Sequence, residues 1–242
     1  MKTLLIGWTM ALAALGAGSA AVAANTVQET RVATGFSRLE IDGQADVILR
    51  QGAHEGVSIE ATTQALRQIE TLVHERTLSI ALIGQRHWWD WVLGGGTTRS
   101  PRITIDFINL DRIEAAGSVR FTAGALKADD LRLDLSGACS LRIDDLRASR
   151  LRLDGAGAVK AELGGNVAAQ FVDLSGASSY QAGNLVSESA VLEVSGAGKA
   201  LINASQSLRV GISGAGAVQY VGNPKLEQEI SGVGKITRRD AP

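Results

Sequence analysis

The stretch Val194-Ser195-Gly196-Ala197-Gly198-Lys199 decides the fold, because close copies of it recur through the second half of the chain. The copies stand at 135–138, 155–159, 174–178, 212–218 and 230–236, and a looser one at 115–119. One equivalent position from each copy gives Glu114, Ser136, Asp154, Ser175, Ser195, Ser213 and Ser231, with spacings of 18 to 22 residues. A period near twenty is typical of a solenoid, in which each copy forms part of one coil.

Three columns of equivalent residues define the expected interior. The residue before each motif position is apolar: Ile113, Leu135, Leu153, Leu174, Val194, Ile212 and Ile230. The residue five positions after it is apolar or aromatic: Val119, Leu141, Val159, Tyr180, Ala200, Val218 and Ile236. Two positions after it stand Ala116, Ala138, Ala156, Ala177, Ala197, Ala215 and Val233. Stacked in parallel at about 4.8 Å, all three columns are expected to face one core. The sequence thus predicts an all-β parallel β-helix of about seven or more coils.

A fourth column is expected to face solvent. Two residues before each motif position stand Arg112, Asp134, Arg152, Asp173, Glu193, Gly211 and Glu229. In this alignment the first four alternate in sign, so neighbouring coils would place opposite charges side by side. Exposed pairs of this kind contribute little stability, which favours a solvated face that helps to set register.

Composition separates the first residues from the rest. Residues 1–24 contain Lys2, then an apolar, Ala-rich run that ends in Ala21-Val22-Ala23-Ala24, which is typical of a cleaved signal peptide; a retained anchor is the alternative. The whole chain has 242 residues, 45% of them hydrophobic, and a net charge of −1. This near-neutral balance argues against nucleic acid as a partner.

The region 25–101 has strand patterns without the close repeat. Alternation predicts strands at 36–41, 45–49, 57–61 and 77–82, and three- and four-residue spacings suggest a short helix over Gln64–Val73. We expect this region to cover the open N-terminal end of the solenoid. The repeated coils then occupy 102–242, beginning with a strand at Arg102–Phe107.

A Trp-rich loop at 85–100 interrupts the N-terminal region. Three of the four tryptophans fall within four positions, followed by a triple glycine and a polar run. Large aromatic side chains on a loop can stack on sugars, sit at a lipid surface or anchor a protein, and they can equally fold back over the core. The candidate ligand-binding residues are Arg86, His87, Trp88, Trp89 and Trp91.

The sequence offers little chemistry for catalysis. His54, His74 and His87 are scattered without metal-ligand spacing, and Cys139 is the only cysteine, so we expect no catalytic residues, metal or cofactor. Cys139 occupies a place that suits a small buried or corner residue. Asp134, Asp154 and Asp173 could stack like the carboxylates of polysaccharide-cleaving β-helices, although a structural ladder explains them more simply.

The segment 126–138, the repeated Ser-Gly-Ala-Gly coils and the ending Gly222-Asn223-Pro224-Lys225 resemble the bacterial GIN-domain family. This family is a domain of unknown function also labelled "putative autotransporter adhesin head", and the resemblance spans roughly 36–238. It implies a right-handed parallel β-helix in the cell envelope and no established activity. Asp46 alone matches the Asp that many relatives carry after the turn, so an acidic ladder or calcium role at those positions is not expected.

These observations favour an exported, non-enzymatic β-helix, adhesin-like or ligand-binding, located in the periplasm or at the cell surface. The expected partner is a glycan, another envelope component or a protein, with peripheral membrane contact as a further option. A polysaccharide-active enzyme and a purely structural or assembly module are the alternatives.

Overall fold

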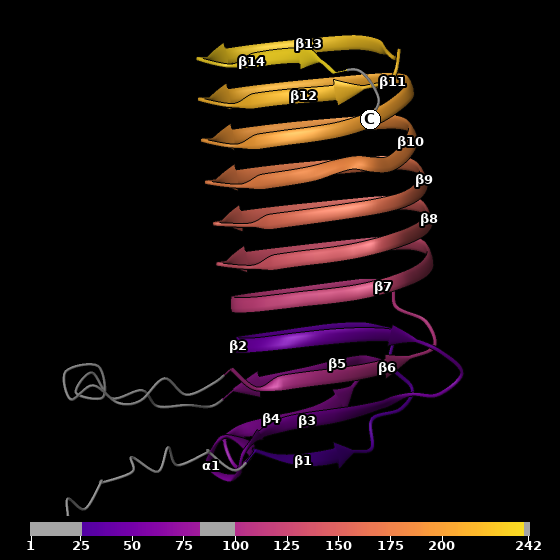
Figure 1. The fold of residues 1–242 in the computed structure, drawn as a ribbon, viewed down its shortest axis with the longest axis vertical. Coiled ribbons are helices and arrows are strands. Elements are labelled where there is room, and N and C mark those ends of the chain that lie inside the picture. Colours follow the sequence, from indigo (N-terminus) through magenta and orange to yellow (C-terminus); the bar gives the residue numbers. More distant parts are fainter. Residues whose placement is uncertain (1–25, 83–99, 240–242) are drawn as a thin grey trace, which may run out of the picture.

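The chain forms a β-solenoid, seen in a computed structural model that describes residues 26–82 and 100–239 (Figure 1). Strands make up 80% of the described residues and wind through about six turns. The predicted all-β solenoid is therefore confirmed, although the expectation of seven or more coils is slightly too high.

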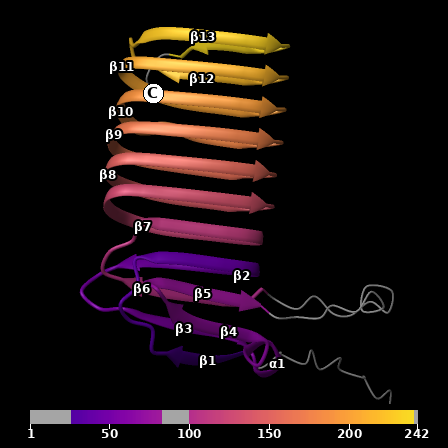
Figure 2. The ribbon, with the colours of Figure 1, turned by 180° about the vertical axis from the view of Figure 1, so that it is seen from behind.

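Most coils are single long strands that bend around the axis. They are β2 (Arg38–Gln51), β7 (Arg112–Gly137), β8 (Ser140–Gly157), β9 (Lys160–Gly176), β10 (Ser179–Gly196) and β11 (Lys199–Gly214). The last full coil consists of β12 (Ala217–Val221) and β13 (Lys225–Gly232), and β14 (Lys235–Arg238) begins the next one by stacking on β12. Neighbouring coils pair in parallel, and each closes at a sharp corner that lies above the previous one (Figures 1 and 2).

The N-terminal end is covered by shorter, mostly antiparallel pairs. These elements are β1 (Thr26–Arg31), β3 (Gly56–Thr62), α1 (Thr63–Leu66), β4 (Ile69–His74), β5 (Thr77–Leu82) and β6 (Arg102–Phe107). The two halves of β2 pair in parallel with β5 and β6, while β3 pairs antiparallel with β6 and β1 with β3. The expected covering of this end by the N-terminal region is thus observed.

The predicted helix over 64–73 is wrong in its extent. Only α1 is helical, with the Thr62 hydroxyl accepting a hydrogen bond from the Ala65 N–H at 3.2 Å. Ile69–His74 is a strand because it pairs antiparallel with all of β5. In a strand, residues three apart lie on opposite faces, and Ile69 is accordingly 4% exposed whereas Leu72 is 63% exposed.

The register of the coils corrects two of the equivalent positions. Ser136 pairs with Ala156 and Leu135 with Gly155, so Asp154 is not the equivalent of Ser136. The same shift of two residues applies to Glu114, whose column position belongs to Ala116, since the Ala138 N–H bonds to Gly117 O. A shift of two preserves the alternation of inward and outward side chains, which is why the misaligned column still looked apolar.

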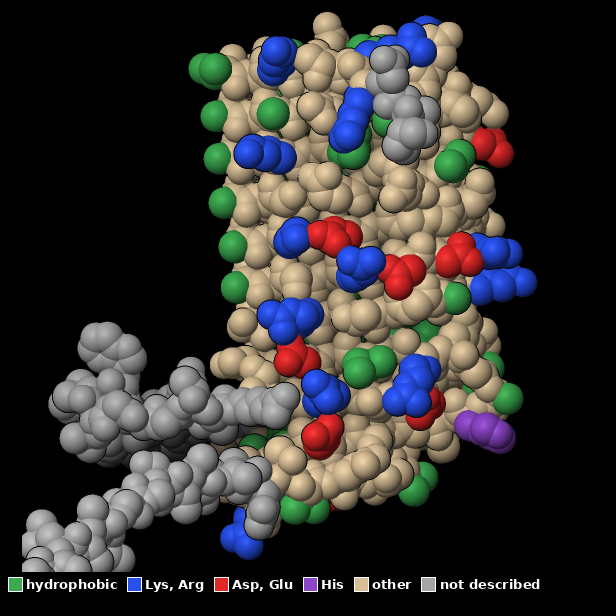
Figure 3. All heavy atoms as spheres, viewed as in Figure 1, with side chains coloured by type: hydrophobic (Ala, Val, Ile, Leu, Met, Phe, Trp, Pro, Cys, Tyr) green, Lys and Arg blue, Asp and Glu red, His purple; other side chains and the backbone are tan. Residues whose placement is uncertain are grey.

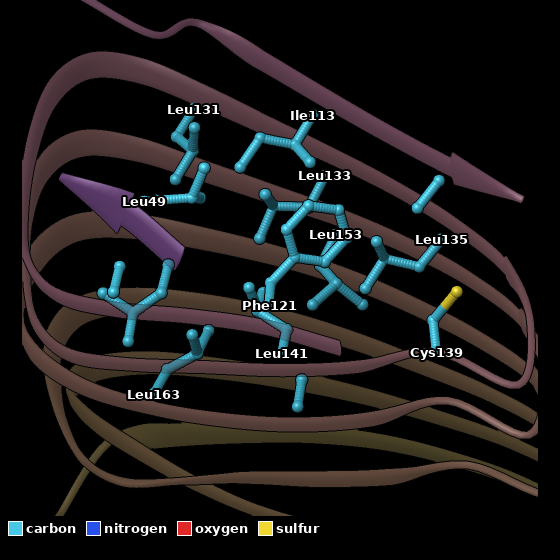
Figure 4. Packing of buried hydrophobic residues seen from close by; sticks show 14 of the residues in the cluster. Leu49, Ile113, Phe121, Leu131, Leu133, Leu135, Cys139, Leu141, Leu153 and Leu163 are labelled. Atoms are coloured by element: carbon cyan, nitrogen blue, oxygen red, sulfur yellow. The ribbon is translucent and has the colours of Figure 1, made fainter. Parts of the chain in front are cut away.

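The interior is packed with the apolar residues that the alternation predicts. Leu131, Leu133, Leu135 and Leu141 are each at most 2% exposed, and they point into one core together with Phe121 (Figure 4). Cys139 is 1% exposed at the inside of the corner, which confirms it as a small buried residue.

The corner alanines, however, do not face inward as expected. The exposed column is Ala138, Ala158, Ala177, Ala197 and Ala215, ending in Val233, and small apolar side chains line one edge of the solenoid in Figure 3. Glycines of positive φ precede these alanines, for example Gly157 at 104°. This conformation turns the chain so that the alanine points outward and the following residue, such as Cys139, points into the core.

Candidate functional site

The correct register gathers carboxylates into one outward column on the face before the corner. We call this column the acidic ladder. Its members are Glu40, Glu114, Asp134, Asp154, Asp173, Glu193 and Glu229, with Gly211 between the last two. The expected alternation of sign along this column is therefore wrong, because it used Arg112 and Arg152 from the neighbouring column. Asp134, Asp154 and Asp173 do stack on adjacent coils.

Arginines line the acidic ladder on the side away from the corner. They are Arg38, Arg112, Arg132, Arg152 and, further along, Arg209. Arg132 bridges two coils, with Nε 3.0 Å from Asp134 Oδ2 and Nη2 3.3 Å from Asp154 Oδ2. A hydrogen bond to Asp154 raises the pKa of Arg152. Opposite charges thus lie side by side across columns, whereas like charges stack along them.

A shallow groove of about 460 Å³ runs along the solenoid axis between the acidic ladder and the corner. Its lining includes the ladder carboxylates from Glu40 to Asp173 on one side and small residues such as Ser136, Ala156 and Ser175 on the other. The hydroxyls of Ser136 and Ser175 donate to Ala115 O at 3.1 Å and Gly155 O at 3.3 Å, in the coil before each. The groove therefore presents regularly spaced carboxylates to a ligand.

The five predicted binding residues, Arg86, His87, Trp88, Trp89 and Trp91, lie outside the described residues. Their attachment points are described. The chain leaves β5 at Leu82, one residue after Ala81, which pairs with Asp42 in the groove lining. It returns at Ser100 and Pro101, where Gln44 Nε2 lies 2.8 Å from Ser100 Oγ and the Asp46 N–H bonds to Pro101 O at 2.9 Å. Both attachment points of the Trp-rich segment thus lie next to β2, near the N-terminal end of the groove.

The other candidates from the sequence do not converge on a site. His74 lies at the exposed end of β4 with Nε2 3.7 Å from Glu75 Oε1, and His54 lies in the loop between β2 and β3. Within 26–82 and 100–239, no cluster of His, Cys, Asp or Glu is suited to hold a metal ion. Burial raises the pKa of the Cys139 thiol, which makes it a poor nucleophile.

Sequence reasoning missed the groove because the misaligned columns assigned the carboxylates of its wall to different columns. An alignment of the copies on their positive-φ glycines, Gly117, Gly137, Gly157 and Gly176, would have revealed the acidic ladder. That signal was present in the sequence, but variable coil lengths concealed it.

Comparison with known proteins supports the architecture. The family model described as "Putative auto-transporter adhesin, head GIN domain" matches residues 35–224. No curated protein matches the chain. No helix among the described residues is long and apolar enough to cross a membrane.

Solved structures share the fold at low identity. A "putative adhesin" from Bacteroides fragilis has a TM-score of 0.77 and 18% identity, covering 89% of this chain and 97% of its own. A "putative adhesin" from Parabacteroides merdae has a TM-score of 0.67 and 17% identity, with coverages of 88% and 96%. A "putative lipid binding protein" from Parabacteroides distasonis has a TM-score of 0.68 and 17% identity, with coverages of 89% and 97%.

Proposed function

The chain belongs to the GIN-domain family, and on that basis we propose that it is an exported, non-enzymatic binding module of the cell envelope whose ligand is a glycan. The adhesin label of the family and of its structural neighbours supports export and a role in binding. The N-terminal run of residues 1–24, with its small-residue ending, supports cleavage of a signal peptide and release into the periplasm or to the cell surface.

One observation carries the choice of ligand: the Trp-rich segment is attached beside the end of the groove. Asp42 lines the groove and pairs with Ala81, and the segment follows directly after Leu82. Carboxylates and arginines repeated once per coil can exchange hydrogen bonds with the regularly spaced hydroxyls of a polysaccharide. Aromatic rings such as those of Trp88, Trp89 and Trp91 offer flat apolar surfaces on which sugar rings stack.

The arrangement of the carboxylates favours binding over catalysis. Asp134 and Asp154 form ion pairs with arginines, and they stand in an even ladder instead of converging on one reacting atom. Polysaccharide cleavage remains the alternative that such stacked carboxylates could serve. Turnover in a polysaccharide screen that disappears in Asp134→Asn or Asp154→Asn would establish that alternative.

The test compares two variants that alter the site with a matched control variant. Trp88, Trp89 and Trp91 are changed together to Ala, and Ala156→Trp fills the groove with a large side chain. The control is Ala158→Trp, since Ala158 is also exposed but lies beyond the corner, outside the groove lining. Binding to purified glycans, peptidoglycan and lipid vesicles is measured for each variant, and circular dichroism checks the fold.

We expect the triple variant and Ala156→Trp to lose glycan binding by at least about tenfold, and Ala158→Trp to bind like the parent. Retained binding in both site variants would overturn the proposal. Binding to vesicles alone would replace the glycan with a lipid. A triple variant that alters self-association instead would point to an assembly module.

A further inference from the structure

The two ends of the solenoid differ in how their strand edges are covered. At the N-terminal end, β5 and β6 lie beyond the first long coil and are themselves paired with β4 and β3. At the other end, within the described part of the chain, β13 pairs only with β11 and β14 only with β12. Figure 1 shows both strands at this end of the solenoid. The outer edges of β13 and β14 therefore present backbone N–H and C=O groups that have no strand partner among these residues.

This C-terminal edge also exposes apolar side chains in core columns. Ile230 continues the buried column of Val194 and Ile212, yet it is 41% exposed. Leu226 and Ile236 are only partly buried, and Val233 at the corner is 85% exposed. Exposed apolar groups beside an unpaired edge are features of an interaction surface.

The charges on this edge are arranged symmetrically about the corner at Gly232. β13 carries Lys225, Glu227 and Glu229 on its outward face, with the two acidic residues nearer the corner, whereas β14 carries Lys235. Glu229 stands three residues before Gly232 and Lys235 three residues after it. Neither Glu229 nor Lys235 forms an ion pair within the described residues, while Glu227 lies 2.7 Å from Arg209.

We propose that the C-terminal edge binds a second copy of this chain, tail to tail, around a two-fold axis through the corner. β13 runs toward the corner and β14 away from it, so this rotation lays β13 of one copy antiparallel to β14 of the other. Residues equally distant from Gly232 then face each other, which places Glu229 opposite the partner's Lys235, and the reverse pair forms by symmetry. Both members of each pair are outward-facing, so the alternation of the two strands also matches.

A second copy is the partner that this edge fits best, because the edge is complementary to itself. The outward charges nearest the corner are acidic on β13 and basic on β14, and they become paired only when a two-fold axis exchanges the two strands. The dimer doubles the length of the solenoid and continues its sheets across the junction. This inference does not depend on the proposed glycan site, which lies on an outward face of earlier coils.

Charge reversal tests the pairing, with mass in solution measured by light scattering and sedimentation over a dilution series. The parent is expected to be a dimer. Glu229→Lys and Lys235→Glu should each weaken dimerisation by about tenfold or more, because like charges then face each other twice. A mixture of the two single variants should form heterodimers, since every facing pair is again opposite in sign, and the double variant should dimerise alone.

Cross-linking locates the junction independently. Val233→Cys places a thiol on the exposed corner, and oxidation should give a covalent dimer. Val32→Cys is the matched control, because Val32 is 93% exposed near the N-terminal end. A parent that is monomeric at all concentrations, a dimer that survives both single reversals, or equal cross-linking of the two cysteine variants would overturn the proposal. A far-ultraviolet circular dichroism spectrum like that of the parent shows that a reversed variant is folded.

Discussion

The stacked corner glycines provide the sharpest test of the fold, through the substitution Gly157→Ala. Gly157 has φ of 104°, which side chains of L residues rarely adopt. A Cβ at this position would lie 2.6 Å from Gly137 O in the coil below. The same carbonyl accepts a hydrogen bond from the Ala158 N–H at 2.8 Å, and Gly157 O accepts one from the Ala177 N–H at 2.9 Å. The added methyl therefore acts on the junction between coils.

The expected cost follows from three contributions. The unfavourable backbone conformation costs about 1–3 kcal/mol. Forcing an extra carbon against the neighbouring backbone costs about 1–3 kcal/mol, by analogy with overpacked cores. The substitution also reduces the conformational freedom of the unfolded chain, which offsets about 0.4–1 kcal/mol of this cost. We therefore expect Gly157→Ala to lower the free energy of unfolding by about 1–5.6 kcal/mol.

Urea denaturation followed by far-ultraviolet circular dichroism measures this change, and Gly124→Ala is the control. Gly124 lacks a positive φ, and a Cβ there would meet no atom within 4 Å. The control should therefore equal or slightly exceed the parent in stability. If Gly157→Ala costs less than about 1 kcal/mol, or no more than Gly124→Ala, the reasoning about the corner fails. Coil-by-coil unfolding would show as a change in the denaturant slope.

Three further predictions concern buried or charged side chains. The Tyr180 hydroxyl donates a hydrogen bond to Gln170 Oε1 at 2.7 Å in the core. Tyr180→Phe leaves that oxygen unpaired, so the free energy of unfolding measured in urea should fall by about 1–3 kcal/mol. An unchanged free energy of unfolding would refute this. Burial raises the pKa of Cys139, so an alkylating reagent near pH 8 should label it much more slowly in folded than in urea-unfolded protein; equal rates would contradict this. The hydrogen bond from Arg209 lowers the pKa of Glu227 below 4.5. The ion pair between Arg209 and Glu227 therefore stabilises the fold above the pKa that Glu227 has in the unfolded chain. This stabilisation is lost as the pH falls through the lower pKa of Glu227 in the folded state. The small difference in urea midpoint between pH 7 and pH 3 should shrink in Glu227→Gln, and an unchanged difference would argue against this pair.

The alternation of polarity predicted the strands more reliably than their register. The strands at 57–61, 77–82 and 102–107 correspond to β3, β5 and β6. The alignment of Asp154 with Ser136 failed because a strand repeats its environment every second residue, so a slip of two positions leaves every polarity unchanged. Polarity cannot distinguish the two registers, whereas the positions of the corner glycines and the hydrogen-bond ladder between coils do.

The candidate site shows the same limit. The sequence supplied the Trp-rich segment as a departure from the repeat, but it could not show that the chain enters this segment next to Asp42, because that position depends on the pairing of β5 with β2. The acidic ladder was similarly hidden, since Asp134 and Asp154 become neighbours only when their coils stack.

The sequence by itself determined that this chain is a solenoid, because a glycine-centred corner recurs every twenty residues or so and alternating apolar residues demand a shared interior. The tertiary structure alone decided which side chains stack, which way the corner alanines point and where the groove runs. The physical reason is that stacking is set by backbone hydrogen bonds between coils and by the positive φ of the corner glycines, such as Gly157. The polarity of the residues predicts neither these hydrogen bonds nor this backbone conformation.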